Sequence, residues 1–342
     1  MKIILKIVSA LFVSGMLFVF SSCQAAQARF ERILGTVCFV NLYEKGREEY
    51  YDEIFARLEQ IDSEFNLGKA DSDLFRINHF ASEKAVKVSD DVFSVLEMAQ
   101  RISELTEGAF DISVEPLVSL WRVNSDSPHV ATTEELAERL PLVNFKNIIL
   151  DSSQKTVKFT QKGMEIDLGG IAKGFAADEL VKICKKHKIR RAVIDLGGNV
   201  YVYGEKAKNQ LWNVGIKNPE FPDSAPLIKI TLPEMSVVTS GIYERYFDEG
   251  EKRYHHILSP KTGYPIENEL YSISVLSKNS MLADALTTAF FVLGTEKSLK
   301  ILPIVQKEFD SELSAIFIKK NHEILFSENF PYFYSILYED WH

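Results

Sequence analysis

Two oxygen-bearing side chains stand out in an otherwise apolar segment of this 342-residue sequence, downstream of a polar turn with two adjacent imidazoles. Asp284 and Thr288 are four residues apart, so a helix would place the carboxylate and the hydroxyl on one face. Hard oxygen atoms of this kind are the protein ligands that Mg²⁺ prefers. The pair therefore predicts a magnesium site, although a buried Asp that caps a neighbouring loop would give the same pattern.

The sequence Asp-Leu-Gly-Gly occurs twice, at residues 167–170 and 195–198, around a helical pattern at residues 172–186. The order predicted is strand, Gly-rich turn, helix, strand (192–194) and Gly-rich turn. Such turns let backbone N–H groups approach a phosphate, although the spacing is neither a dinucleotide fingerprint nor a P-loop. Two ordinary left-handed turns are the alternative. Lys173 opposes the helix dipole, so a phosphate or carboxylate is expected beside it unless it extends into solvent.

A third segment, residues 106–121, combines a flat apolar side chain, Phe110, with a hydrogen-bond acceptor, Asp111. A planar heteroaromatic ligand needs such a face and such an edge. The alternative is that this segment simply packs in the core around Pro116 and Trp121.

Periodicity and capping residues predict the elements that must position these groups. Helices are expected at residues 48–65, 90–106 and 281–293, and another is expected to begin at Thr132 or Thr133. Strands are expected at residues 35–43, 227–232, 272–276 and 313–318. Because strands and helices mix without a strict alternation, the fold class is α+β.

The first 22 residues differ from the rest of the chain. Lys2 and Lys6 precede an apolar run and the small residues before Cys23, which is typical of a secretory signal of the lipoprotein type. We therefore expect a signal peptide at residues 1–22 and a lipid on Cys23; plain secretion or an uncleaved anchor are the alternatives. Loss of the two lysines changes the net charge from −9 to −11, which argues against nucleic-acid binding.

Taken together, these segments resemble the ApbE family of FAD:protein FMN transferases. The matching pieces lie in the family's order at residues 34–36, 72–78, 108–111 with 116–121, 167–174, 195–198, 239–241, 254–263 and 284–288. The resemblance implies one large T-fold-like domain, residues 23–342, with mixed sheets and flanking helices. It also implies a transferase that uses FAD as substrate and Mg²⁺ as cofactor.

The resemblance also assigns the site. The metal would be held by Asp284, Thr288 and the backbone carbonyl of Ala176. The flavin or adenine would contact Leu34, Asn78, Ala109, Phe110, Asp111, Lys173, Ile257 and Leu258. One member of the pair His255 and His256, with His256 favoured, would act as the base for the acceptor hydroxyl. Many family members carry Tyr where this chain has Asn78, so a change of Asn78 to Tyr is expected to alter FAD turnover.

The implied reaction transfers FMN from FAD to a Thr or Ser of an acceptor flavoprotein in a membrane redox complex, releases AMP, and includes hydrolysis of FAD as a parallel activity. It would take place at the periplasmic face of the inner membrane, with the lipid on Cys23 as anchor. The alternative function is an exported FAD-binding lipoprotein that stores or delivers flavin without catalysis; a solute-binding receptor fits less well. Cys38 and Cys184 could pair, although Cys184 is expected to be a small core residue.

Overall fold

The computed structural model describes residues 28–43, 48–338 and 341. Within that part of the chain the main sheet has eight strands, and each neighbouring pair is antiparallel. In spatial order the strands are β1 (Arg29–Ile33), β2 (Thr36–Asn41), β6 (Arg191–Leu196), β7 (Asn199–Gly204), β10 (Met235–Gly241), β13 (Leu270–Ser277), β14 (Leu313–Lys319) and β15 (Ile324–Phe326).

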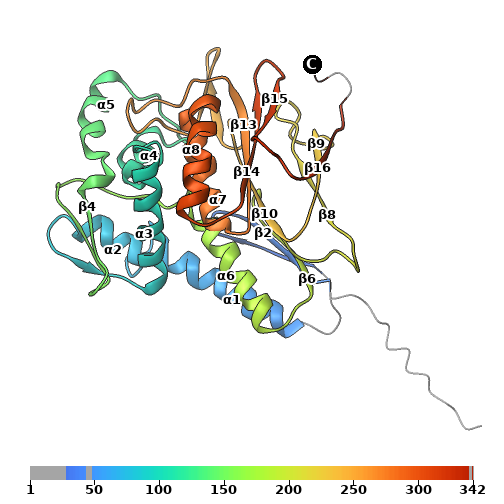
Figure 1. The fold of residues 1–342 in the computed structure, drawn as a ribbon. Helices are drawn as coiled ribbons and strands as arrows, with labels where there is room; N and C mark the ends of the chain where they lie inside the picture. The colour runs from blue at the N-terminus through green and yellow to red at the C-terminus, as the bar shows by residue number, and fades with distance from the viewer. Residues whose placement is uncertain (1–27, 44–47, 339–340, 342) are drawn as a thin grey trace, which may run out of the picture.

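The two faces of this sheet are covered differently (Figure 1). Four helices pack on one face: α1 (Glu48–Glu64), α6 (Ala172–Lys186), α7 (Ser280–Leu293) and α8 (Thr295–Glu308). Helix α3 (Asp90–Leu105) packs against α7, and together these helices form the largest core. A three-stranded sheet covers the other face: β8 (Trp212–Ile216), β9 (Ile228–Leu232) and β16 (Phe333–Ile336). The molecule is therefore a helical layer, a large sheet and a smaller sheet.

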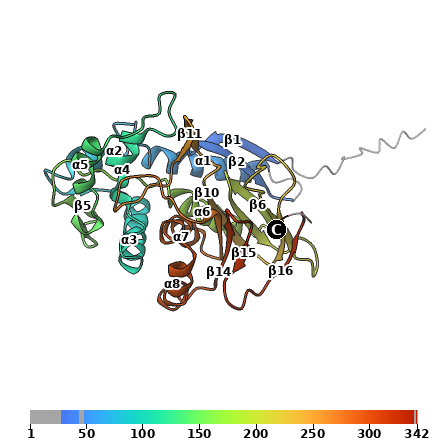
Figure 2. The ribbon, with the colours of Figure 1, turned by 90° about the horizontal axis from the view of Figure 1, so that it is seen from above.

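A smaller region extends from one side of these layers, as the view from above shows (Figure 2). It contains α2 (Asp73–Phe80), α4 (Glu115–Trp121), α5 (Thr133–Arg139), β3 (Val86–Lys87), β4 (Ile148–Asp151) and β5 (Thr156–Phe159). The hairpin of β11 (Tyr246–Glu249) and β12 (Lys252–His255) lies between this region and the main sheet. The candidate site is at this junction.

The helices form where local sequence signals are strong, and the predicted helices are confirmed. In α1, Ile54, Leu58 and Ile61 recur on one face and are fully buried. Ser89 caps α3 by accepting a hydrogen bond from the Val92 N–H at 3.2 Å. Thr132 caps α5 in a reciprocal capping box. The predicted strands at 35–43, 227–232, 272–276 and 313–318 are confirmed as β2, β9, β13 and β14, and the α+β class is confirmed.

The prediction of a strand before the first Gly-rich turn is wrong. Residues 164–168 belong to no strand of the described structure. Their backbone groups bond elsewhere: the Asn78 side chain accepts from the Ile166 N–H at 2.8 Å and donates to the Ile166 carbonyl at 3.0 Å. The Asp167 N–H donates to the Ile112 carbonyl at 2.8 Å. Because these partners satisfy the backbone, the segment is held without a neighbouring strand.

The two cysteines of the described part do not pair. No disulfide joins Cys38 and Cys184, and both are fully buried, so Cys184 is a small core residue as expected. The predicted signal peptide, residues 1–22, and the lipidated Cys23 lie outside the described residues. Over the residues that the structure describes, we find no helix with the length and apolar character needed to cross a membrane.

Candidate active site

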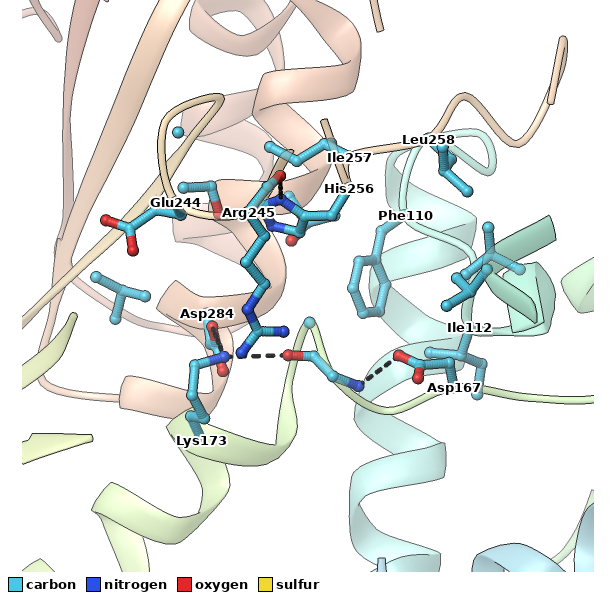
Figure 3. Close-up of a pocket in the computed structure, with 18 of the residues that line it drawn as sticks. Phe110, Ile112, Asp167, Lys173, Glu244, Arg245, His256, Ile257, Leu258 and Asp284 are labelled. Carbon is cyan, nitrogen blue, oxygen red and sulfur yellow. Dashed lines mark hydrogen bonds and ion pairs between the residues drawn. The ribbon is translucent and has the colours of Figure 1, made fainter. Parts of the chain in front are cut away.

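The candidate site is a cavity of about 210 Å³ where α6, α7, the 109–114 segment and the loop after β12 converge. Figure 3 shows Lys173, Arg245 and Asp284 on one side of it and Phe110 across from them. The cationic side chains thus lie on one side with Asp284, and Phe110 lies on the other side, where Asp167 lies next to Ile112. Such a cavity suits a ligand with both an anionic part and a planar apolar part.

Helices α6 and α7 cross closely at their N-terminal turns, and the crossing fixes Asp284. The Asp284 Oδ2 accepts a hydrogen bond from the Gly174 N–H at 2.9 Å. In return, Asp178 of α6 accepts from the Ser280 and Met281 N–H groups of α7, each at 2.9 Å. Each helix therefore supplies a carboxylate that caps the other helix.

The glycine at position 174 is required by this crossing. A Cβ atom there would lie 2.3 Å from the Ser280 carbonyl oxygen, closer than atoms approach. A carboxylate or phosphate is expected beside Lys173 from the sequence, and the carboxylate is that of Asp284. The Lys173 Nζ lies 3.8 Å from Asp284 Oδ1 and donates to the Gly169 carbonyl at 3.1 Å (Figure 3).

The two Gly-rich turns differ in conformation although their sequences match. Gly197 and Gly198 have φ values of +67° and +91°, so the second turn is left-handed as the alternative interpretation expected. At the first turn, neither Gly169 nor Gly170 has a positive φ. The turn is instead tied by the Asp167 carboxylate, which accepts from the Gly169 N–H at 2.7 Å. Both turns line the cavity.

Phe110 and Asp111 lie in the wall opposite the charged groups. Asp111 uses both carboxylate oxygens within the protein: Oδ1 accepts from Ser113 and Oδ2 from the Phe145 N–H at 3.0 Å. Burial raises the pKa of Asp111, while these hydrogen bonds lower it. Asp111 thus ties the 109–114 segment to Phe145.

The two adjacent histidines have different environments. His255 donates from Nε2 to the Ile266 carbonyl at 2.9 Å, and its Nδ1 accepts from the Ile257 N–H at 3.3 Å, so both nitrogens are engaged. Burial lowers the pKa of His255 to about 4. His256 lines the cavity and bonds through Nδ1 to the Arg245 carbonyl at 3.1 Å. Removal from water lowers the pKa of His256 to about 3, so the ring is neutral near pH 7.

The tautomer of His256 follows from its partner. A carbonyl oxygen only accepts, so Nδ1 of the neutral ring carries the proton and Nε2 has a free lone pair. A free imidazole nitrogen in a cavity can accept a proton from a hydroxyl group. Of the two histidines, His256 has the geometry of a base.

Most of the predicted site residues meet in this cavity. Those that line it are Ala109, Phe110, Asp111, Lys173, His256, Ile257, Leu258, Asp284 and Thr288. Four do not line it. Leu34 lines an adjoining open pocket, Asn78 bonds to the Ile166 backbone, His255 faces the Ile266 carbonyl, and Ala176 is fully buried.

Arg245 is a site residue that sequence reasoning missed. It lines both the cavity and the adjoining pocket, and its carbonyl holds His256. It stands outside every motif of the sequence analysis, so no local pattern marked it.

Gly170 is the backbone residue beside Thr288: a Cβ on Gly170 would lie 3.2 Å from the Thr288 Oγ1. Ala176, the predicted carbonyl ligand, does not line the cavity.

The donors present fit a magnesium ion. Asp284 and Thr288 lie one helical turn apart and both line the cavity. Mg²⁺ is usually held by one or two carboxylates together with substrate phosphates, so one carboxylate is sufficient here. Consistent with this, the described residues contain no cluster of three or more His, Cys, Asp or Glu side chains that could hold an ion alone.

Comparisons with known proteins agree with this geometry. The model of the ApbE family matches residues 34–313. The FAD:protein FMN transferase of Klebsiella pneumoniae strain 342 is 38% identical over 86% of this chain and 90% of that protein. The enzyme of the same description from Treponema pallidum strain Nichols is 36% identical over 85% of this chain and 84% of that protein.

Solved structures give the same result. The ApbE protein of Thermotoga maritima has a TM-score of 0.79 and 31% identity, with coverage of 89% of this chain and 97% of that one. The flavin transferase ApbE of Vibrio cholerae has a TM-score of 0.77 and 26% identity, with coverage of 89% and 97%.

Proposed function

The chain belongs to the ApbE family and is a flavin transferase, and we propose that it uses Mg²⁺ to transfer FMN from FAD to a Thr or Ser of a partner protein, with release of AMP. One observation carries the proposal: Asp284, Thr288 and Lys173 share a single cavity with an aromatic wall and a neutral imidazole. The diphosphate of FAD would lie at the charged side and the flavin against Phe110.

The proposed reaction exchanges one phosphorus–oxygen bond for another. The acceptor hydroxyl oxygen attacks the phosphorus of the FMN half, and the bond from that phosphorus to the bridging oxygen breaks. AMP leaves with the bridging oxygen and needs little protonation, because a phosphate is a stable anion. The hydroxyl proton moves to Nε2 of His256.

The charges around the diphosphate support this assignment. Lys173 holds a positive charge beside the Gly169–Gly170 turn, and Arg245 lines the same region. A magnesium ion held by Asp284 and Thr288 would neutralise diphosphate charge. The turn and the α6 N-terminus supply backbone groups next to it. The carbonyl of Ala176 stays the predicted third ligand of the metal. Gly170 is the backbone residue adjacent to Thr288.

Two variations of this function follow from the same site. Water in place of the acceptor hydroxyl would hydrolyse FAD to FMN and AMP. An FAD carrier without catalysis is the second candidate, and it would need no base in the cavity. The free Nε2 of His256 favours the enzyme over the carrier.

We propose that the protein works outside the cytoplasm, at the periplasmic face of the inner membrane. The lipid on Cys23 would anchor it there, and its acceptor would be a flavoprotein of a membrane redox complex. The support is the lipoprotein-type signal in the first 22 residues.

The test is to incubate the mature chain with FAD and Mg²⁺, with and without a Thr-containing flavoprotein acceptor, and to follow all products by mass spectrometry. A transferase gives AMP and an FMN-sized mass gain on the acceptor, and Asp284→Ala or EDTA abolishes both. Free FMN and AMP would identify chiefly a hydrolase. FAD that stays intact and bound in every sample would refute the catalytic proposal.

A further inference from the structure

The side chain of Asn199 is fully buried and only half satisfied. Its Oδ1 accepts a hydrogen bond from the Ser280 Oγ at 2.8 Å and a longer one from the Ser236 Oγ at 3.4 Å. Its Nδ2 has no hydrogen-bond partner in the described structure. A buried donor without a partner costs stability, so its retention calls for a ligand or another function.

The position of Asn199 points to the ligand. It is the first residue of β7, directly after the left-handed Gly197–Gly198 turn, and it lines the cavity. Its partner Ser280 begins α7, one helical turn before Asp284, and touches Gly174 of α6. The amide therefore lies where the N-terminal turns of both helices meet, beside the residues assigned to the diphosphate.

Two other neutral hydroxyls that line the cavity, those of Thr239 and Ser240, are committed within the protein. The Thr239 Oγ1 bonds to the Ser274 Oγ at 2.7 Å. The Ser240 Oγ donates to the Thr287 Oγ1 at 2.8 Å. The serine hydroxyls bond the carbonyl end of the Asn199 side chain and leave its NH₂ group without a partner in the described structure.

We propose that the Nδ2 of Asn199 binds a diphosphate oxygen of the substrate as a neutral donor. This inference rests on the proposed function only in taking the ligand to be a diphosphate-containing flavin nucleotide. Asn199 adds a directed hydrogen bond to the charges of Lys173 and Arg245. A hydrogen bond from a fixed donor to an anionic oxygen is stronger than one between neutral groups.

The experiment measures binding, not turnover. The mature chain and its Asn199→Ala variant are titrated by calorimetry with FAD, ADP and riboflavin, in EDTA and again with Mg²⁺. We expect Asn199→Ala to raise the Kd for FAD and ADP about 10- to 100-fold, the value of one hydrogen bond to a charged group. The Kd for riboflavin, which lacks the diphosphate, should change less than about twofold. Asn199→Asp, of equal shape, should weaken ADP binding further, because it places a negative charge beside an anion.

Tyr243→Phe is the matched control, because the Tyr243 hydroxyl is also buried but lies outside the cavity lining. It should leave every Kd unchanged. Should Asn199→Ala fold poorly, the isosteric Asn199→Asp gives the same comparison.

Wild-type affinity of both Asn199 variants for ADP would overturn the inference, and so would an equal loss for riboflavin. Failure of the proposed function would give a different result: the wild-type chain would bind FAD normally and release no AMP.

Discussion

At the residue scale, His256 is the group whose chemistry depends most on its surroundings. Its Nδ1–H is fixed on the Arg245 carbonyl, and its pKa is lowered to about 3 by removal from water. The free enzyme therefore holds a ring that is already neutral, with Nε2 ready to accept a proton. A bound diphosphate brings negative charge, which stabilises the imidazolium and raises this pKa toward neutrality.

His256→Asn should lower the rate of FMN transfer by about 10²- to 10⁴-fold, the usual contribution of a general base, while FAD affinity stays within about twofold. His255→Asn should mainly lower the melting temperature, because His255 makes two interior hydrogen bonds. Single-turnover transfer and FAD titrations measure both quantities. An equal loss of FMN transfer in the two variants would show that transfer depends on the structure of the turn that carries His255 and His256, and not on a base at His256.

The pH dependence of His256 gives a separate prediction. The acid limb of kcat/KM reports the free enzyme, whereas that of kcat reports the enzyme with FAD bound. Since the pKa of His256 is about 3 in the free enzyme and rises in the complex, the kcat limb should lie at the higher pH. Steady-state rates between pH 4 and 9 should therefore show an acid limb in kcat but none in kcat/KM, and an acid limb of kcat/KM at or above that of kcat would contradict the prediction.

Glu115 is a buried acid that the proposed reaction does not use. It is 8% exposed, its Oε2 has no hydrogen-bond partner in the described structure, and burial, then Asp167 and Glu165, raise its pKa to about 8. The folded state therefore binds this proton more tightly than the unfolded chain. The resulting stability is present below the unfolded pKa and is lost as the pH rises toward about 8.

Glu115→Gln should remove this loss, because the amide cannot ionise. We expect the urea midpoint of the wild-type chain to fall more between pH 5.5 and 8 than that of the variant. The exposed Glu59→Gln variant is the control and should follow the wild type. If the urea midpoints of Glu115→Gln and wild type change with pH in the same way, ionisation of Glu115 does not destabilise the folded state.

The residues that sequence could and could not place differ in where their partners lie. Asp284 and Thr288 were found because helical spacing puts both on one face. Leu34, Asn78 and Ala176 were assigned by resemblance to family positions, and their surroundings depend on contacts distant in sequence. Asn78, for example, bonds to Ile166, 88 residues away. Whether these residues contact the ligand stays a prediction.

At the element scale, the crossing of α6 and α7 determines the geometry of the site. Asp178 and Asp284 cap opposite helices, and Gly174 permits their approach. Periodicity predicted both helices, with α6 at 172–186 as observed. It did not predict their crossing, because neither carboxylate shows in sequence which distant N–H groups it accepts. For the same reason the strand expected before the first Gly-rich turn is not found: at residues 164–168 side-chain and loop partners hold the backbone instead.

Gly174→Ala tests the crossing. The added methyl group must displace Ser280, so the helices separate and Asp284 loses its bond to the residue 174 N–H. We expect a loss of roughly 1–3 kcal/mol of unfolding free energy, typical of overpacking, together with weaker Mg²⁺ binding to the FAD complex. Gly68→Ala is the control, since its Cβ would lie 3.4 Å from Asn66 and needs little adjustment. A Gly174→Ala protein with normal stability and metal affinity would refute this account of the crossing.

At the scale of the whole molecule, the main sheet separates the start of the described chain from the site. Arg29 pairs with Val40, Asn41 with Val193, and Arg191 with Gly204, so β1 and β6 begin at the same end where β2 and β7 finish. The opposite end carries the Gly197–Gly198 turn, which lines the cavity. Six-residue strands at about 3.3 Å per residue put these ends roughly 20 Å apart.

This arrangement predicts how the proposed lipid anchor would orient the enzyme. A lipid on Cys23 lies only a few residues before β1, so the end of the sheet with Arg29 would face the bilayer and the cavity would face away from it. A mobile acceptor domain could then reach the flavin without entering the membrane. The exposed Lys206 and Lys208 lie at the bilayer-facing end, where anionic headgroups would attract them.

Fluorescent labels measure this orientation in the acylated protein on vesicles that contain a lipid-borne quencher. A label on Lys208→Cys, at the end near Arg29, should be quenched more strongly than one on Asn124→Cys, which lines the cavity. The same labels on Cys23→Ser protein, which cannot be acylated, provide the baseline. Equal quenching at both positions would mean that the molecule lies on its side or rotates freely about its linker, and the acceptor would then have to approach along the membrane surface.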